Sequence, residues 1–209
     1  AENHLEEISG IYVPFWLYSC ESNGSFSFDA TRTHHYTDGD YDVTETEHYL
    51  VLRDGEARFN NIPVDGSSKM DDAYMDAIEP FYYSAITDFH TDYLPGYAAQ
   101  TYDEDATACA PRATARVKNT TIAAIRRTCD YTTLTPRTSK ISTTQNSVDY
   151  ALLPVWMLTT NWHGKSYHFA INGQTGKLIG DLPIDKGRFF SLLAGITIPL
   201  GILLKLFIF

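Results

Sequence analysis

Two short motifs in the sequence carry residue types that could bind ions or phosphate. Asp38, Asp40 and Asp42 have the spacing of the first three ligands in a calcium loop, but Val43 stands where such a loop needs glycine and Tyr49 where it needs glutamate. The triplet therefore predicts a solvated acidic hairpin tip rather than a calcium site.

The second motif, GQTGK from Gly173 to Lys177, has only part of the pattern of a phosphate-binding loop. It is shorter than such a loop, and Leu178 stands where serine or threonine would hold magnesium. Asn172, Gly173 and Gly176 are of the types that form tight turns. We therefore predict strand-linking turns here, and we regard these three residues as structural or interaction residues.

The histidines form no local catalytic pattern. His34 and His35 are adjacent in a predicted strand, so their side chains point to opposite faces and cannot share a metal ion. His163 and His168 have neither an acidic residue nor a thiol close by in the sequence. The sequence also lacks a nucleophile elbow, a zinc-protease helix motif and a paired-carboxylate signature. An enzyme is therefore not predicted, and a site assembled only in the folded chain is the remaining enzymatic alternative.

Composition narrows the classes of partner and cofactor. The chain has 26 acidic and 16 basic residues and a formal net charge of −10, so it lacks the excess of positive charge that nucleic-acid binding needs. Cys20, Cys109 and Cys129 are widely spaced and form no C-x-x-C pair. We therefore expect free, buried thiols in a reducing compartment, and no metal or other cofactor bound by this chain.

The pattern of apolar residues predicts an α+β domain over residues 11–184, after a short acidic lead-in at residues 1–10. Alternating apolar and polar residues over 11–62 predict a four-stranded antiparallel meander. Its turns are expected at Ser22–Asn23–Gly24 and at Asp54–Gly55, because asparagine, aspartate and glycine favour tight turns.

The middle of the domain, residues 68–129, is predicted to be helical. In the longest candidate helix, small or apolar residues recur at helical spacing, which is typical of a helix that packs one face on a core. These residues include Cys109, Ala113, Val117 and Thr121. Threonine-rich antiparallel strands are predicted to follow over residues 131–184, so sheet units flank a central helical segment.

One stretch of sequence occurs twice. VPFWLY near the start of the chain matches LPVWML near its end, with Trp16 and Trp156 in register and Pro14 and Pro154 two residues before them. Each segment is followed by a polar turn and a strand with alternating aromatic residues. We therefore predict two similar strand–turn–strand hairpins, each headed by Pro-x-Trp. Exposed aromatic residues between them could form a groove for a small ligand or a peptide.

Residues 189–209 predict a transmembrane helix that anchors the domain in a lipid bilayer. Lys205 is the only charged residue in this stretch, and a helix of this length would span about 30 Å, the thickness of a hydrocarbon core. Lys177, Lys186 and Arg188 precede the stretch, which by the positive-inside rule places the domain on the cytoplasmic side.

Several phrases together resemble one bacterial family. GIYVPFWLYS at the start, VDGSSKMDD and YLPGYAAQTYD in the middle, and ALLPVWML with NGQTGKLIGDLP towards the end are similar to membrane proteins that contain zinc ribbons of the transcription-factor-IIB type. The resemblance extends over residues 10–209. It implies one or more zinc ribbons N-terminal to a domain of this kind, a C-terminal membrane helix and a location in the bacterial inner membrane. Zinc is expected only in such a ribbon, whose cysteine pairs this sequence does not contain.

These observations predict a non-enzymatic, membrane-anchored domain that acts as a docking or scaffold module at the cytoplasmic face of a bacterial membrane. Its expected partners are the bilayer, through residues 189–209, and other proteins of a membrane complex. The first alternative is a ligand- or peptide-binding module that uses the aromatic groove between the two Pro-x-Trp hairpins. An enzyme is the less favoured alternative.

Overall fold

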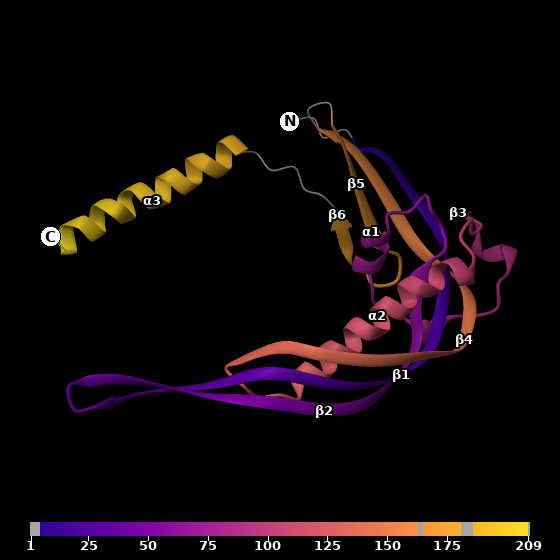
Figure 1. Ribbon diagram of the computed structural model, residues 1–209. Helices are drawn as coiled ribbons and strands as arrows, with labels where there is room; N and C mark the ends of the chain where they lie inside the picture. The colour runs from indigo at the N-terminus through magenta and orange to yellow at the C-terminus, as the bar shows by residue number, and fades with distance from the viewer. Residues whose placement is uncertain (1–4, 163–164, 181–185, 209) are drawn as a thin grey trace.

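The computed structural model describes residues 5–162, 165–180 and 186–208, and one antiparallel sheet dominates it (Figure 1). The elements in chain order are β1 (Leu5–Asp38), β2 (Tyr41–Asp65), α1 (Asp72–Ala77), the 3-10 turns η1 (Tyr83–Ala85) and η2 (Thr91–Tyr93), β3 (Tyr97–Ala99), α2 (Ala106–Arg127), β4 (Thr133–Trp162), β5 (Lys165–Asn172), β6 (Leu178–Gly180) and α3 (Lys186–Ile208). Among these residues the strand order is β2–β1–β4–β5–β6, and β3 pairs with β1.

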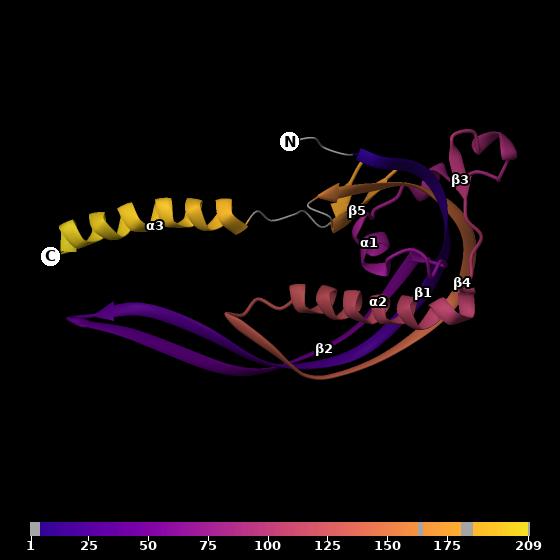
Figure 2. The ribbon, with the colours of Figure 1, turned by 90° about the horizontal axis from the view of Figure 1, so that it is seen from above.

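β1 and β2 form one long hairpin, whose far end extends beyond the other strands as a curved arm (Figure 2). Its turn lies at Gly39–Asp40, because Asp38 pairs with Tyr41 and Gly39 has a φ of +61°. The acidic triplet therefore lies at a hairpin tip, as predicted. The predicted four-stranded meander over residues 11–62 is wrong, since this region is made of two long strands.

The two predicted turns of that meander are glycines inside strands. Gly24 pairs with Gly55 within the ladder between β1 and β2. A Cβ atom on Gly55 would lie 2.6 Å from Cδ1 of Ile125 in α2, and one on Gly24 would lie 2.7 Å from Cζ of Phe26. Glycine in a strand often marks such a close approach rather than a turn. The physical reason for these glycines is therefore the packing of a helix and an aromatic ring on the sheet.

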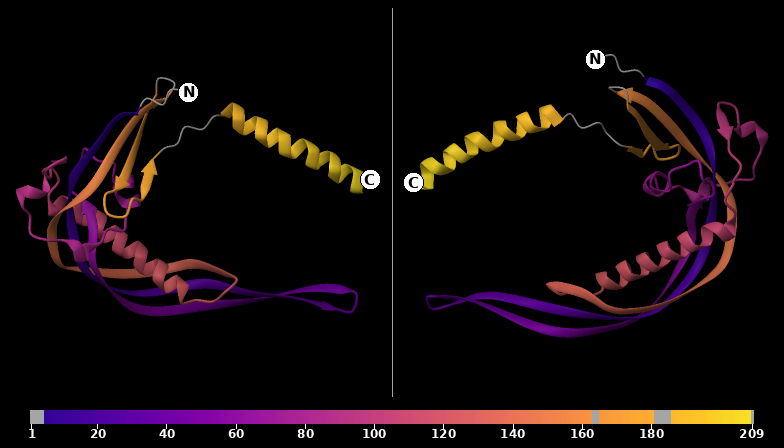
Figure 3. Two further views of the ribbon diagram at one scale, coloured as in Figure 1. Left: turned by 180° about the vertical axis from the view of Figure 1, so that it is seen from behind. Right: turned by 45° about the horizontal axis from the view of Figure 1, so that its top comes forward.

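α2 lies along the concave face of the sheet and forms the core with it (Figure 3). Asp105 caps the N-terminus of α2, since its side chain accepts a hydrogen bond of 2.8 Å from the backbone amide of Ala108. Further core residues lie between the sheet and α1. The predicted buried stripe of the helix is confirmed, and it consists of Cys109, Ala113, Val117 and Thr121.

The segment 68–129, which was predicted to be helical, contains two helices with a largely irregular stretch between them. α1 is capped by Asp71, whose side chain accepts hydrogen bonds from two amides of the first turn. The chain then forms η1, η2 and β3, because Pro80 and Pro95–Gly96 cannot continue a helical ladder. β3 extends the sheet beside residues 10–12 of β1.

α3 is the C-terminal helix (Figure 1). In the part of the chain that the structure describes, no helix is long and apolar enough to cross a membrane. This finding overturns the predicted transmembrane helix over 189–209. It also overturns the bilayer as a partner and the bacterial inner membrane as the location.

Candidate functional site

The two Pro-x-Trp segments lie next to each other at the centre of the sheet. β1 and β4 pair antiparallel, with Val13 opposite Leu153. Because the matching segments run in opposite directions from this pair, an approximate two-fold axis through it relates Pro14 to Pro154, and it relates the two tryptophans in the same way. The repeated sequence therefore forms the two central strands of one sheet.

The same relation extends to the outer strands. Phe15 pairs with Asp65 of β2, and Val155 pairs with Asn172 of β5, so the β1–β2 and β4–β5 hairpins have the same register around the repeat. The structure thus contains two similar hairpins. In the first hairpin, however, the return strand is β2 and not the predicted segment around Phe26, because β1 continues through its glycine to the distant tip.

A matching hydrogen bond closes each hairpin where the chain leaves the sheet. The amide of Gly66 donates to the carbonyl of Pro14, and the amide of Gly173 donates to the carbonyl of Pro154, both at 2.9 Å. A Cβ atom on Gly173 would lie 2.8 Å from that carbonyl oxygen, so glycine is required there. Gly176 follows in the turn with a φ of +72°, which favours glycine. The prolines and glycines of the repeat therefore have structural roles.

Both tryptophans of the repeat are half-buried and pack on tyrosines between η2 and α2. The ring centroids of Trp16 and Tyr102 lie 5.0 Å apart, as do those of Trp156 and Tyr97. Trp16 Nε1 also donates a hydrogen bond of 2.9 Å to the carbonyl of Glu104. Tyr97 and Tyr102 therefore pack beside the two tryptophans, so each tryptophan belongs to a cluster of aromatic rings.

Asn172 is buried and fixes the end of α1 to the sheet. Its Nδ2 atom donates to the carbonyls of Ile78 and Pro80, each at 3.0 Å. Its Oδ1 atom accepts from the amides of Gln174 and Thr175 at 2.8 and 3.0 Å. The predicted turn between the strands is confirmed as a turn between β5 and β6, and the side chain of Asn172 organises it.

A network of ion pairs joins α2 to α1 and to the end of β2, and sequence reasoning missed it. Arg112 Nη2 lies 2.7 Å from both Asp65 Oδ1 and Asp76 Oδ1, and its Nη1 lies 2.6 Å from Asp72 Oδ1. Asp65 is 1% exposed. A buried carboxylate needs such a partner, because an unpaired charge in the interior is costly. Three carboxylates on α1 and β2 thus share one guanidinium.

Burial controls the titration of the groups around this network. Burial raises the pKa of Asp65, although the charge of Arg112 opposes the shift. Burial also raises the pKa of Glu79, although Arg116 donates to its Oε2 atom at 2.8 Å. Burial, assisted by nearby carboxylates, raises the pKa of the Cys109 thiol to about 11. Such a thiol is a packing residue rather than a nucleophile, and these shifts follow from the packing of the helices on β2.

The histidines that could have bound a metal have separate partners. His34 Nε2 lies 3.9 Å from Glu47 Oε2, whereas His35 Nδ1 lies 2.9 Å from the hydroxyl of Thr44. Across the described residues, no group of three or more His, Cys, Asp or Glu side chains could hold a metal ion. His163 lies outside the described residues.

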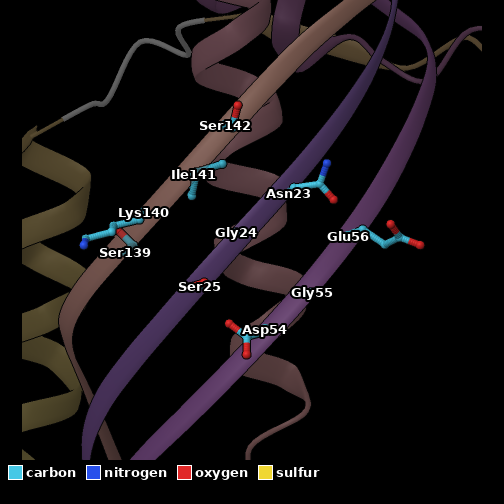
Figure 4. A pocket seen from close by; sticks show the side chains of 10 residues that line it. All are labelled: Asn23, Gly24, Ser25, Asp54, Gly55, Glu56, Ser139, Lys140, Ile141 and Ser142. Atoms are coloured by element: carbon cyan, nitrogen blue, oxygen red, sulfur yellow. The ribbon is translucent and has the colours of Figure 1, made fainter.

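An open depression of about 960 Å³ crosses β1, β2 and β4 in the middle of the sheet. Figure 4 shows its lining side chains with α2 behind the strands. The glycine pair Gly24 and Gly55 forms part of its floor, and serine and asparagine side chains form much of its wall. Its charged residues are Asp54, Glu56 and Lys140. This open, polar surface has neither the enclosed shape nor the apolar lining typical of a small-molecule site.

The outer edge of β2 is a different kind of surface. β2 is the first strand in the sheet order, so no described strand pairs with its outer side. From Tyr41 to Phe59, a stretch that we call the β2 edge, the ladder to β1 runs without a register shift and the sequence contains neither proline nor lysine. Leu50 and Leu52 of this edge are 56% and 66% exposed. Sheet edges are commonly protected by charged side chains, above all lysine, by proline or by bulges. The β2 edge has charged residues of both signs but no lysine, proline or bulge, so it is open to another strand of complementary charge.

The outer edge of β4 has the protection that the β2 edge lacks. Between Thr133 and Pro154, β4 pairs with β1 alone among the described strands. This stretch contains Pro136, Arg137 and Lys140, and its ladder to β1 shifts register twice. Proline, lysine and bulges each hinder the addition of a further strand, and the β2 edge contains none of the three. The same sheet therefore has one protected and one unprotected long edge.

Comparison with known proteins identifies a similar bacterial protein, but its description gives no function. No family model and no solved structure matches the chain. The chain is 38% identical over 205 residues to a protein of Bacillus subtilis (strain 168) described as the uncharacterized protein YdjG. The match covers 98% of this chain and 60% of that relative, so the chain spans about three fifths of the relative's length. No family model supports the resemblance to zinc-ribbon membrane proteins, so that resemblance stays a prediction.

Proposed function

We propose that this chain is a non-enzymatic docking module that binds protein partners by adding a strand along the β2 edge. The observation that carries the proposal is an unpaired, unprotected edge with two exposed leucines on it. An added strand would pair the outward backbone N–H and C=O groups of β2, and alternate side chains would supply specificity.

The β2 edge suits such a partner because side chains on one face of the strand are exposed and those on the other face pack in the core. Leu50 and Leu52 are exposed, whereas Val51, between them, is buried and packs in the core with Phe28. A strand added here would cover the leucines without disturbing that core. Complete burial of a leucine contributes at most about 1.5–3 kcal/mol, so covering the two leucines would add to the stabilisation from the backbone ladder.

The alternative functions have less support. The acidic groups and the cysteine with raised pKa values lie in the network that holds α1 and α2 on β2, which is a structural explanation for groups that could otherwise indicate catalysis. The two tryptophans of the predicted aromatic groove already pack on Tyr102 and Tyr97 of the same chain. The docking proposal uses a surface that the fold leaves open.

Site-specific photo-cross-linking in cells tests the proposal. A photoreactive amino acid is placed at Leu52 on the β2 edge in one variant and at Lys140 on the protected edge of β4 in another. Both positions are exposed on the same sheet, so they differ chiefly in which edge they report. We expect discrete protein adducts from position 52 and far weaker ones from position 140.

A second variant separates docking from random contact. Leu50→Asp introduces a charge at the centre of the β2 edge and should abolish the adducts from position 52, while circular dichroism and thermal unfolding stay close to those of the unmodified chain. Equal adducts from positions 52 and 140, or adducts from position 52 that survive Leu50→Asp, would contradict a docking role for the β2 edge.

A further inference from the structure

We infer that the strand which pairs with the β2 edge is β2 of a second copy of this chain, running antiparallel, with Leu50 opposite Leu50. This inference rests on the proposed docking function and names the partner. It would join two sheets into one continuous sheet across a two-fold axis, which is the commonest symmetry of protein dimers.

The register follows from the charges on the β2 edge. With Leu50 at the axis, Glu47 faces Arg53 of the second copy and Asp42 faces its Arg58, and symmetry forms each pair twice. Opposite charges that face each other across strands stabilise a sheet, and like charges destabilise it. In this register Glu56 and Asp54 face threonines, so no two like charges stand opposite each other.

Neighbouring registers are worse for electrostatic reasons. A shift by two residues in one direction places Glu45 opposite Arg53 of the second copy but also places Asp42 opposite Glu56, so a repulsive pair replaces one of the two kinds of ion pair. A shift by two residues in the other direction places Glu47 opposite Gly55 and Asp42 opposite Asn60, so both ion pairs are lost. Odd shifts would place core-facing side chains opposite exposed ones.

The apolar side chains agree with the same register. Leu50 and Leu52 of one copy and the same residues of the other would form one patch across the seam, since diagonal neighbours on adjacent strands lie within reach of long side chains. Their exposed fractions in the single chain, 56% and 66%, would fall on pairing. Arg58 is 80% exposed in its contact with Glu21, so its side chain is accessible to a further carboxylate.

A cysteine cross-link tests the register directly. In a Cys129→Ser background, where the remaining Cys20 and Cys109 are buried, Leu50→Cys places two thiols opposite each other across the axis. Directly opposed Cβ atoms lie about 5 Å apart in an antiparallel pair, close to the separation of a disulfide. Leu52→Cys is the matched control, because its two copies would be offset along the strands by roughly 13 Å. Mild oxidation of the purified full chain should give a disulfide-linked dimer for Leu50→Cys and almost none for Leu52→Cys.

Charge reversal provides an independent readout by sedimentation analysis. Glu47→Arg alone and Arg53→Glu alone should each weaken dimerisation about tenfold or more, because each change makes two attractive pairs repulsive. The double variant with both changes should restore dimerisation, since it recreates the two pairs with the signs exchanged. A double variant that failed to fold could not regain dimerisation, so restored dimerisation would show that the single variants act through the charge pairs.

The outcomes distinguish this inference from the proposed function. A chain that is monomeric at all concentrations, a dimer that Leu50→Asp leaves intact, or equal cross-linking of the two cysteine variants would overturn self-pairing. If position 52 still yields photo-adducts with a different protein, docking at the β2 edge stands and only the identity of the partner changes. If the chain is monomeric and position 52 yields no adduct, both proposals fail.

Discussion

The β1–β2 and β4–β5 hairpins share a register and a glycine–proline hydrogen bond, but each buries a different polar residue before that glycine. In the first hairpin the residue is Asp65, which faces the guanidinium of Arg112 from α2. In the second it is Asn172, which donates to two carbonyls at the end of α1. The repeated unit therefore requires the backbone bond, whereas the element packed against it determines the side chain. A cation selects a carboxylate, and two carbonyl oxygens select an amide.

The hairpins also differ in length, and this difference determines their surfaces. β5 pairs with β4 beside the repeat and β6 pairs with β5, whereas β2 continues along β1 to the tip, and no described strand pairs with its outer side. The longer hairpin therefore provides the open edge, and the shorter one completes the core around Asn172.

The largest expected effect comes from removing the cation of the first hairpin. Arg112→Met leaves Asp65 buried without its partner, and breaking a buried pair in this way typically destabilises a protein by about 3–5 kcal/mol. Urea denaturation measures the change in the free energy of unfolding. The double variant Arg112→Met with Asp65→Asn should recover much of the loss, because it removes the unpaired charge. Equal losses in the single and double variants would show that burial of the charge is not the cause.

The second prediction exchanges the polar residues between the hairpins. Asn172→Asp replaces a donor by a carboxylate oxygen that faces the carbonyls of Ile78 and Pro80, and the cost of such a buried mismatch is about 2–4 kcal/mol. Asp65→Asn should cost less at neutral pH, because the amide oxygen can still accept from Arg112. Thermal unfolding of the two variants side by side measures the difference, and the opposite order would contradict the comparison.

The third prediction concerns the tryptophans of the repeat. Trp16→Phe removes the hydrogen bond to the carbonyl of Glu104 as well as part of the ring, whereas Trp156→Phe mainly reduces packing on Tyr97. Trp16→Phe should therefore destabilise the chain by about 1 kcal/mol more than Trp156→Phe. Chemical denaturation followed by far-ultraviolet circular dichroism detects this difference without relying on tryptophan fluorescence. Equal losses would mean that the hydrogen bond adds little.

The sequence predicted the parts of the fold that depend on local periodicity. The buried residues of α2 recur at helical spacing, and the two Pro-x-Trp segments have similar sequences, so both features were predicted correctly. Gly24 and Gly55 were misread as turns because their cause, the approach of Ile125 and Phe26, depends on tertiary packing. The membrane anchor, which was inferred from hydropathy and from the family resemblance, was wrong.

The candidate site was less accessible to sequence reasoning. Arg112 and Asp65 are 47 residues apart, so nothing in the local pattern connects them. The β2 edge exists only because β2 comes first in the strand order, which the sequence does not specify. The absence of lysine and proline between Tyr41 and Phe59 was the available clue, and it becomes meaningful once this stretch is known to be one continuous strand.

The fourth prediction is a pH dependence that separates burial from charge pairing at Asp65. Burial raises the pKa of this carboxyl in the folded chain above its unfolded value, so the folded chain binds this proton more tightly. The resulting stabilisation is fully present below the unfolded pKa of about 4 and is lost as the pH rises through the folded pKa. Asp65→Asn removes this titration, whereas Glu79, whose pKa is also raised, titrates in both proteins and cancels.

The free energy of unfolding of the unmodified chain minus that of Asp65→Asn should therefore fall as the pH rises from about 4, by about 1.4 kcal/mol for each unit by which the pKa is raised. Above the raised pKa the difference should level off. Urea denaturation of both proteins at closely spaced pH values measures it. A difference that grows with pH would mean that the attraction of Arg112 outweighs burial. Asp65 would then stabilise the first hairpin through its charge, a contribution that the neutral Asn172 of the second hairpin cannot make.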